Sequence, residues 1–322
     1  MTRYIIRRLL WAIVLFFAVT IVTYVIFFVV PQDPAFELCG KSCAPDDIKR
    51  VKHYWHLDQP VPVQYGYFVK RLVINHSLGR SFANRQDVNE IIAAAAPVTA
   101  SLVIGGAILW MLIAIPLGVL SALRPRSLLD RASMTFVLIG ISAHPVWIGL
   151  IFAFLFGFKL GWFPITGYCD MFSPPPGTCG GPVQWAYHLF LPWATFALLF
   201  SATYTRMIRA QVIETKNEDY VRTARAKGAP ETVVIRSHVL RNAMLPVVTL
   251  LGLDIGLALG GAIFTETVYA LPGLGKRTLQ ALDTFDLPTI MGVVVFATIV
   301  IIVFNLIVDL LYAWVDPRIR YD

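Results

Sequence analysis

A charge-free apolar stretch of membrane-spanning length near the start of the chain constrains its fold more than any other feature. Residues 9–30 contain no Asp, Glu, Lys or Arg, and about 20 helical residues are enough to cross the core of a bilayer. A removable signal peptide is the alternative, but the stretch is too long for one and no clear small-residue cleavage site follows. We therefore expect a retained first membrane span.

Five further charge-poor stretches extend this prediction to an all-α membrane protein with six transmembrane helices. Of the 322 residues, 57% are hydrophobic and 15% are charged, whereas soluble domains average about half and about a quarter. The net charge of +7 could indicate a nucleic-acid partner, but the basic residues flank the apolar stretches, so membrane lipid explains them better. The five stretches are residues 98–123, 132–158 (interrupted by His144 and Pro145), 189–205, 245–265 and 290–315.

The distribution of Lys and Arg predicts which side of the membrane each segment occupies. Arg3, Arg7 and Arg8 precede the first span, and basic residues next to spans favour the cytoplasmic side. We therefore expect a multi-pass protein of the bacterial cytoplasmic membrane, with both termini in the cytoplasm. The expected organisation is a first unit of residues 1–30, an extracytoplasmic insertion of residues 31–97, a five-helix core of residues 98–315 and a tail of residues 316–322.

A basic polar stretch between the fourth and fifth spans interrupts this apolar pattern. Residues 206–241 hold eight Lys or Arg against four acids, and a loop this basic is expected in the cytoplasm. The stretch predicts a helix, a turn and a second helix, because Gly228 follows a helix-compatible segment and Pro230 suits the start of the next. A side chain at Gly228 would then cost about 1–2 kcal/mol, since we expect a left-handed turn there. An ordinary basic loop that holds two spans is the alternative on composition alone.

Two segments of this stretch resemble a known family. YVRTARAKG followed by LRNAMLP is similar to the cytoplasmic loop of the permease subunits of type I ABC importers, specifically the oligopeptide, dipeptide and nickel group. The general family pattern is Glu-Ala-Ala, three residues and Gly, which here falls on Arg222, Thr223, Ala224 and Gly228, so the acid is missing at its usual place. The resemblance implies that residues 206–244 hold a coupling helix that docks on an ATP-binding subunit. The contacts it implies are Asp219, Tyr220, Arg222, Thr223, Ala224, Lys227, Gly228 and Pro230.

The resemblance also implies the permease fold and a set of partners. They are a homologous second permease subunit, two cytoplasmic ATP-binding subunits that carry ATP and Mg, and an external substrate-binding protein that delivers a peptide. A nickel or other small-solute importer is the alternative within the family. A stand-alone secondary transporter and a membrane-embedded enzyme are alternatives from other classes.

The outer segment supports the same resemblance. Residues 56–82 are similar to the segment between the first two spans of peptide permeases, and they predict an amphipathic helix with Tyr65, Phe68, Val69 and Leu72 on one face. A membrane-surface cap and a contact for the substrate-binding protein both remain open for this segment.

Residues 270–278, ALPGLGKRT, look like a phosphate-binding loop. That motif needs Gly, four residues, then Gly-Lys and Ser or Thr, whereas Ala270 stands in place of the first Gly and Arg277 follows Lys276. The segment resembles instead the Leu-Pro-Gly-Leu-Gly turn after the fifth span of the permease family. We therefore expect no nucleotide or cofactor on this chain. Catalytic residues are not expected either, and His144 is interpreted as a packing residue at a kink.

Asp254 is the one ionisable residue expected deep in a span. A charge at that depth is costly and by default faces a cavity or a partner. It is predicted either to line the substrate path or to form hydrogen bonds at the interface with the second permease. Small residues that allow close helix contact surround it in either case, namely Gly252, Gly256, Gly260 and Gly261.

The four cysteines all fall on the expected outer side. Cys39 and Cys43 lie in the first outer loop, and Cys169 and Cys179 lie in the second. An oxidising exterior permits disulfides, and four cysteines allow three pairings. Local pairs within each loop are favoured. A metal site built from the four thiols is the weaker alternative, because the sequence shows neither tight paired spacing nor nearby histidines.

Overall fold

The computed structural model describes residues 2–29, 46, 49, 52–53, 58–172, 179–260 and 262–315. Within these ranges the regular secondary structure is helical apart from two isolated β-bridges. Among the described residues, four helices are long and apolar enough to cross a membrane. Two bent helix pairs bring the number to six if each pair is one span. The predicted all-α, multi-pass architecture is confirmed. The four single candidates are Ile6–Val29, Val88–Leu123, Pro182–Lys216 and Leu287–Val308.

The described helices follow one another along the chain, with the longest intervals before α4, before α5 and before α8. In chain order they are α1 (Thr2–Tyr24), η1 (Val25–Val29), α4 (Val61–Val73), α5 (Val88–Leu123), α6 (Leu128–Ser142), α7 (Pro145–Phe152), η2 (Ala153–Lys159), α8 (Pro182–Lys216), α9 (Asp219–Ala226), α10 (Glu231–Val233), η3 (Val234–Leu240), α11 (Arg241–Ala243), α12 (Leu245–Leu259), α13 (Ile263–Val268), α14 (Leu274–Asp283) and α15 (Leu287–Val315).

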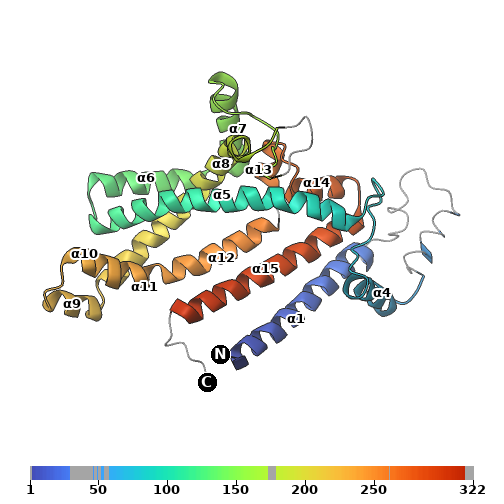
Figure 1. Ribbon diagram of the computed structural model, residues 1–322, viewed down its shortest axis with the longest axis horizontal. Coiled ribbons are helices and arrows are strands. Elements are labelled where there is room, and N and C mark those ends of the chain that lie inside the picture. The colour runs from blue at the N-terminus through green and yellow to red at the C-terminus, as the bar shows by residue number, and fades with distance from the viewer. Residues whose placement is uncertain are drawn as a thin grey trace.

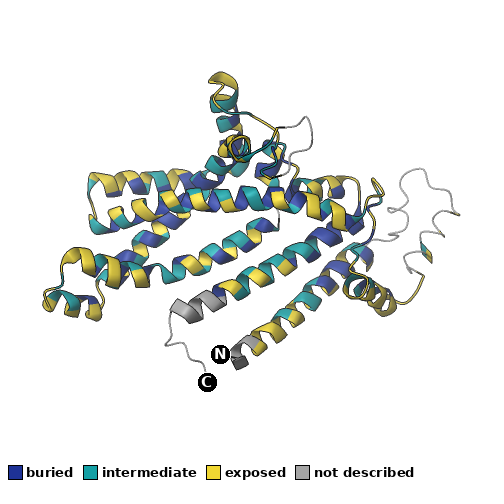
Figure 2. Cartoon of the chain, viewed as in Figure 1, coloured by how far each residue is buried: buried dark blue, intermediate teal, exposed yellow. Residues whose placement is uncertain are grey.

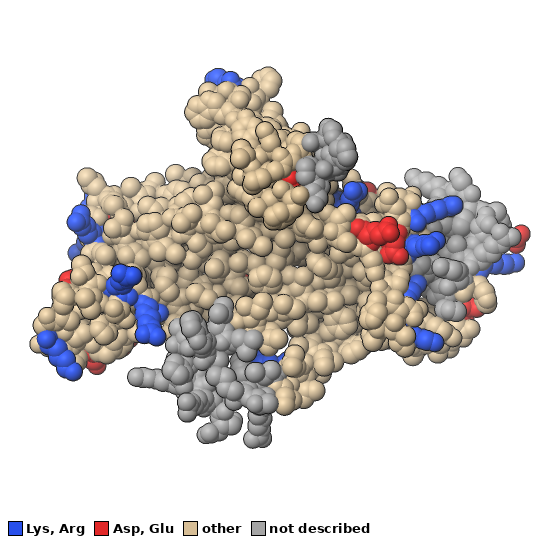
Figure 3. Space-filling view, in the orientation of Figure 1, with Lys and Arg blue, Asp and Glu red and all other residues tan. Residues whose placement is uncertain are grey.

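The long helices run back and forth between two ends of the molecule (Figure 1). The first, which we call the hook end, carries α9 and α10, and the start of α1 and the end of α15 lie toward it. The second, the cap end, carries α4 and α14. Figure 3 shows Lys and Arg mainly near the two ends of this face, while its middle is almost free of charge. This distribution matches a protein whose middle lies in lipid.

Helices α5 and α8 pack along most of their length and form the centre of the bundle. Trp110 of α5 is fully buried and stacks on Phe200 of α8, with ring centroids 4.5 Å apart. Close approach depends on Gly118, where a Cβ atom would lie 2.8 Å from the side chain of Ile208. Because lipid tails are as apolar as these side chains, the contact is stabilised by close packing rather than by transfer out of water.

Helix α12 packs mainly against α15, and glycines make this contact possible as predicted. A Cβ atom on Gly252 would overlap the side chain of Val308, and one on Gly256 would lie 3.4 Å from Phe304. Gly261 lies outside the described residues. Figure 2 shows exposed residues in yellow along the long helices, and many of these exposed residues are large and apolar.

The third predicted span is two helices rather than one. Helices α6 and α7–η2 meet at an angle of 106°, and the bend lies at His144 and Pro145, where the sequence predicted that the stretch 132–158 is interrupted. The 15 residues of α6 reach about 22 Å, short of the roughly 30 Å of a bilayer core. The break has a local cause, because a residue before proline avoids helical geometry and His144 is extended (φ −90°, ψ 138°). The ring of His144 accepts the Val146 N–H at 3.3 Å and so caps α7.

The amphipathic helix expected in the outer segment is α4, and it packs on the first span. Tyr65 and Phe68 contact the ring of Tyr24. Two hydrogen bonds reinforce the contact, from Tyr24 Oη to Gln64 Oε1 at 3.1 Å and between Thr20 Oγ1 and Tyr65 Oη at 2.9 Å. These contacts support the cap that the sequence left open.

The turn that follows α4 is fastened to the start of α15. Asp286 accepts hydrogen bonds from Ser81 Oγ at 2.5 Å, from the Phe82 N–H at 2.9 Å and from Thr289 Oγ1 at 2.7 Å. The outer segment is thus attached to both the first and the last long helix.

Two helices are longer than their apolar stretches predicted. Helix α5 begins at Val88, where Asp87 caps it by accepting the Asn89 N–H at 2.8 Å, so residue 98 is not its start. Pro97 lies inside it, as membrane helices tolerate. Helix α8 continues past residue 205 to Lys216. Arg209 therefore lies on a helix and not in a loop.

Candidate functional site

The hook, residues 217–233, turns the chain back by the predicted helix, glycine and second helix. Helix α9 ends before Lys227, and Gly228 has φ +79°. Its N–H donates to Arg225 O at 2.9 Å. A Cβ atom added to Gly228 would meet no described atom within 4 Å, so backbone conformation rather than space demands the glycine. The left-handed turn expected at this position is confirmed.

Contacts on both sides of the turn hold the hook in shape. Arg225 donates from Nε to Glu231 Oε2 at 3.1 Å and from Nη2 to Oε1 at 2.9 Å, so one guanidinium joins α9 to α10. Val221 is fully buried and belongs to the same core cluster as Val234 and Val239 of η3. A movement of α9 would therefore be passed to η3 and the start of α12.

The opposite face of the hook is open to solvent. Asp219 and Arg222 lie 3.6 Å apart on it, and Tyr220 Oη accepts a hydrogen bond from Asn242 Nδ2 at 2.8 Å. Of the residues expected to contact an ATP-binding subunit, only Ala224 is half-buried. The exposed ones are Asp219, Tyr220, Arg222, Thr223, Lys227, Gly228 and Pro230.

An ion pair between a buried carboxylate and a partly exposed guanidinium, which the sequence did not predict, ties three helices together near the hook end. Arg209 of α8 donates to both carboxylate oxygens of Asp130 of α6, at 2.7 and 3.0 Å. Ser121 of α5 donates to the same carboxylate and accepts from Arg209 Nε at 3.1 Å. The available sequence signal was Ser127 followed by Asp130, the spacing of a helix cap. We call Ser121, Asp130 and Arg209 the clamp.

Asp254 lies on α12 and faces a mainly apolar groove of about 360 Å³. Its carboxylate accepts a hydrogen bond from Tyr204 Oη at 2.6 Å. The groove runs between α8, α12, the start of α7 and the start of α13, and Pro145, Phe200 and Phe264 are among its lining residues. A half-buried carboxylate beside an open apolar surface fits both predicted roles, the substrate path and a subunit interface.

A second acid, Glu266, which the sequence did not single out, is buried inside the protein. Glu266 of α13 is fully buried, whereas Asp254 is half-buried. The carboxyl group of Glu266 accepts hydrogen bonds from Thr99 Oγ1 at 2.7 Å and from the Lys276 N–H at 2.9 Å. The Leu274 N–H in turn donates to Thr99 Oγ1 at 2.8 Å. Burial raises the pKa of Glu266, although these hydrogen bonds oppose the shift.

The glycine-rich turn wraps around this carboxyl group. A Cβ atom on Gly273 would overlap the Glu266 carboxyl group, and one on Gly275 would lie 2.7 Å from the backbone of Ile263. The resemblance of residues 270–278 to a phosphate-binding loop therefore has a structural cause, because its backbone encloses an anion of the same chain. We call Thr99, Glu266 and residues 273–276 the cradle.

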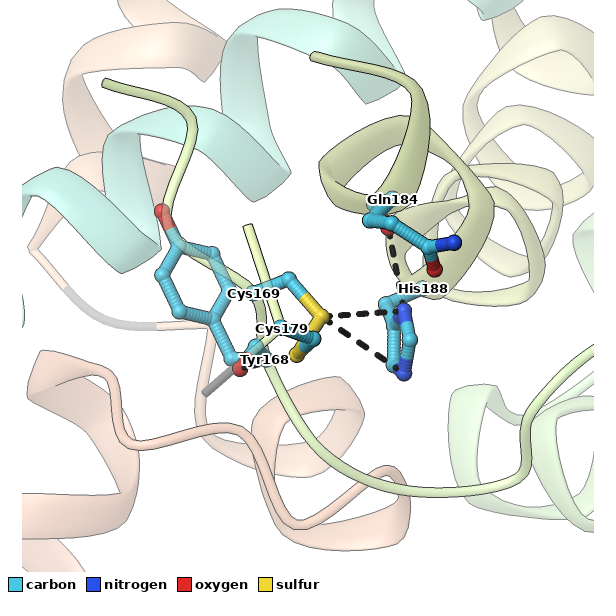
Figure 4. The surroundings of a disulfide bond; sticks show 5 residues. All are labelled: Tyr168, Cys169, Cys179, Gln184 and His188. Atoms are coloured by element: carbon cyan, nitrogen blue, oxygen red, sulfur yellow. Dashed lines mark hydrogen bonds between the residues drawn. A yellow bond between two sulfur atoms is a disulfide. The ribbon is translucent and has the colours of Figure 1, made fainter. Parts of the chain in front are cut away.

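Cys169 and Cys179 form a disulfide, the local pairing that the sequence favoured, with Cα atoms 5.2 Å apart. The ring of His188 faces the Cys169 sulfur, as Figure 4 shows, with Nδ1 at 3.3 Å and Nε2 at 3.7 Å. His188 comes from the first turns of α8, so distance along the chain hid this contact. Cys39 and Cys43 lie outside the described residues.

Comparison with known proteins identifies relatives over the whole length of the chain. The family model described as binding-protein-dependent transport system inner membrane component matches residues 114–321, and a model for the N-terminal part of such components matches residues 1–103. A putative peptide transport system permease protein of Brucella abortus is 36% identical over 322 residues, all of both chains. The oligopeptide transport system permease protein AppB of Bacillus subtilis is 37% identical over 322 residues, again all of both chains. The dipeptide transport system permease protein DppB of Alkalihalophilus pseudofirmus is 36% identical over 335 residues, with both chains fully covered.

Proposed function

Because this chain belongs to the family of binding-protein-dependent transport system inner membrane components, we propose that it is a permease subunit of an ATP-driven importer that carries peptides across the cytoplasmic membrane. Full-length relatives named for peptide, oligopeptide and dipeptide transport support the choice of substrate. The family model is that of a membrane component of a transport system, which agrees with the expectation that ATP and Mg bind to separate subunits.

The observation that carries the mechanism is the hook, which is exposed on one face and braced on the other. Asp219, Tyr220, Arg222, Thr223, Ala224, Lys227, Gly228 and Pro230 form the surface that docks on an ATP-binding subunit. The bidentate contact of Arg225 with Glu231 keeps α9 and α10 in one arrangement, and buried Val221 links α9 to the core. Movement of the ATP-binding subunits would thus reach α12 as a rigid displacement and not be lost in a flexible loop.

This assignment also sets the orientation. The hook end faces the cytoplasm, where ATP is available, and both termini lie on the same side. The cap end, with α4 and the turn fastened to Asp286, faces outward and receives peptide from a substrate-binding protein. The hook, the start of α1 and the end of α15 lie toward the same end of the molecule, which supports this arrangement (Figure 1).

The remaining partner is a second, homologous permease, and Asp254 faces the path between the two subunits. Its carboxylate would attract the amino group of a peptide, while Tyr204 holds it in position through the 2.6 Å hydrogen bond. The apolar walls of the groove beside it suit varied side chains.

Site-specific photo-crosslinking tests the proposed docking surface. A benzophenone side chain is placed at Thr223 on the hook or, as a matched control, at exposed Thr284 at the end of α14. The tagged chain is irradiated in its own membranes and its crosslinked partners are identified by mass spectrometry. We expect an ATPase subunit at position 223 and none at position 284. The proposal fails if neither position yields an ATPase, or if both do so equally.

Import itself is tested with the purified complex in proteoliposomes. ATP-dependent uptake of peptide, absent when the substrate-binding protein is omitted, is the expected result. Uptake that continues without the ATP-binding subunits would instead identify an ion-driven transporter.

A further inference from the structure

The disulfide and the histidine beside it contain the donor atoms of a metal site. One atom each of Cys169, Cys179 and His188 lies within 4.8 Å of the other two. We propose that reduction of the disulfide converts these three side chains into a site for a thiophilic divalent cation of the Zn²⁺ type. The site is separate from the hook and the groove, so it does not depend on the proposed transport function.

The orientation of His188 supports metal binding. Its Nδ1 lies 3.0 Å from the backbone carbonyl oxygen of Gln184, and a carbonyl only accepts, so Nδ1 carries the proton. The lone pair of Nε2 is then free for a metal, 3.7 Å from the Cys169 sulfur. Metal-binding histidines almost always donate their other N–H to a carboxylate, a carbonyl or water in this way.

The donor atoms reach the spacing of a metal site after two movements, a turn of the His188 ring and a displacement of Cys179. Zn–S bonds of about 2.3 Å and Zn–N bonds of about 2.0–2.1 Å in a tetrahedral site place neighbouring ligand atoms about 3.5–3.8 Å apart. The distance from Cys169 Sγ to His188 Nε2 falls in this range, but Nδ1 is the nearer nitrogen at 3.3 Å, so the imidazole ring must turn to aim the Nε2 lone pair at a metal bound to the sulfur. Cys179 must move away once the S–S bond is broken, and it can do so because it is exposed, whereas Cys169 is buried and fixed.

The conversion balances with a dithiol as the reductant. A dithiol thiolate attacks the exposed Cys179 sulfur, and Cys169 leaves as a thiolate beside His188. The second thiol of the reductant then releases Cys179, so that the dithiol ends as its own disulfide. The attacking thiol has already lost one proton to solvent, and binding of the cation by two thiolates and one imidazole releases the other, while water completes the coordination. The outer loop thus remains attached to the first turns of α8 in either redox state.

Cobalt spectroscopy of the full-length chain tests this site. The tag-free protein carries Cys39→Ser and Cys43→Ser, so that the thiols in question are Cys169 and Cys179, and a phosphine reduces it without supplying competing thiols. Titration with Co²⁺ should produce thiolate-to-cobalt charge-transfer absorption and the strong visible bands of tetrahedral Co²⁺, with one ion per chain. Zn²⁺ should displace the cobalt, and the oxidised protein should give neither signal.

Matched histidine variants separate a ligand from a bystander. His188→Asn should weaken Co²⁺ binding by at least about 10-fold. Loss of a residue that only hydrogen-bonds to a metal ligand already costs about that much, and loss of a ligand should cost more. His144→Asn, which keeps an acceptor at the cap of α7, should leave it unchanged. His188→Cys provides a replacement thiolate and should restore binding, which distinguishes ligand loss from misfolding.

Three results would each overturn the proposal. One is absence of the cobalt bands after reduction, and another is unchanged affinity in His188→Asn. The third is a disulfide that the phosphine cannot open in the folded chain, because the metal-binding form could then not arise.

Discussion

The cradle permits a specific prediction about a single added methyl group. In Gly273→Ala the new Cβ atom would overlap the carboxyl group of Glu266. The backbone at Gly273 itself is extended, with φ −89° and ψ 179°, so alanine adopts it without strain. Any destabilisation must therefore come from displacement of Glu266, which is fully buried.

The hydrogen bonds of the carboxyl group set the magnitude. Displacement of Glu266 breaks its bonds to Thr99 Oγ1 and to the Lys276 N–H, at 2.7 and 2.9 Å. At a pH above the raised pKa of Glu266, where the group is a carboxylate, hydrogen bonds to this charged group contribute about 1.5–3 kcal/mol each. Gly273→Ala should thus lower the free energy of unfolding by about 3–6 kcal/mol.

A double-mutant cycle tests this cause. Glu266→Ala removes the same two hydrogen bonds together with the group that the new methyl would overlap. In that background Gly273→Ala should cost less than about 1 kcal/mol, which leaves an interaction energy of at least about 2 kcal/mol, well outside the additivity of independent sites. Gly275→Ala is the control, because its Cβ atom would lie 2.7 Å from the backbone of Ile263, which Glu266→Ala does not relieve.

The assay is reversible unfolding of the purified chain in mixed detergent micelles, followed by tryptophan fluorescence. Additive effects of Gly273→Ala and Glu266→Ala, within about 0.5 kcal/mol, would refute the overlap as the cause. Rescue of Gly275→Ala by Glu266→Ala would refute it equally, since that rescue would indicate a general loosening of the turn.

Four further predictions concern the hook, the groove, the clamp and the cradle. Gly228→Val should lower peptide uptake per ATP hydrolysed in the reconstituted complex while membrane insertion stays normal, and Gly228→Asn should do so less because asparagine tolerates a left-handed backbone; normal coupling in the valine variant would contradict the role of the turn. Asp254→Asn should reduce peptide uptake, and unaltered uptake of every peptide tested would exclude a place in the path. Asp130→Asn should lower the free energy of unfolding by about 1.5–3 kcal/mol, because the partly exposed Arg209 loses its charged acceptor; a loss below about 0.5 kcal/mol in the micelle assay would contradict the clamp. The pKa of Glu266 is raised in the folded chain, so folding favours its protonated form, and stability from this group should fall as pH rises from the ordinary glutamate pKa through the raised one; Glu266→Gln should remove that part of the pH dependence.

Local signals account for what the sequence predicted. The span pattern depends on runs of apolar residues, and the hook depends on Gly228 and Pro230, whose backbone preferences act within a few residues. Both features were therefore visible without knowledge of the fold. The ends of the helices were harder to predict. Helix α8 continues beyond residue 205 to Lys216 as a polar helix, so its last turns lie outside the apolar stretch from which the span was predicted.

Contacts between distant residues account for what the sequence did not predict. Arg209 reads as a basic residue flanking a span, and only the packing of α6 against α8 reveals Asp130 as its partner. Thr99 and Glu266 are 167 positions apart, and His188 is 19 positions from Cys169. In the sequence each of these polar residues looks like an ordinary loop or span-end residue. Only the folded structure shows the partner, which comes from another part of the chain.

The glycine-rich turn shows how a motif can indicate the right physics and the wrong ligand. A phosphate-binding loop works because glycines let backbone N–H groups approach an anion closely. Residues 273–276 satisfy the same requirement, since Gly273 leaves room for the Glu266 carboxyl group and the Lys276 N–H donates to it. The anion, however, is supplied by α13 of the same chain and is sealed from solvent, so a nucleotide has no access. A glycine-rich turn that follows a buried carboxyl group by a few residues is therefore expected to enclose that group. A glycine-rich turn with no such carboxyl group is expected to bind a phosphate from a ligand.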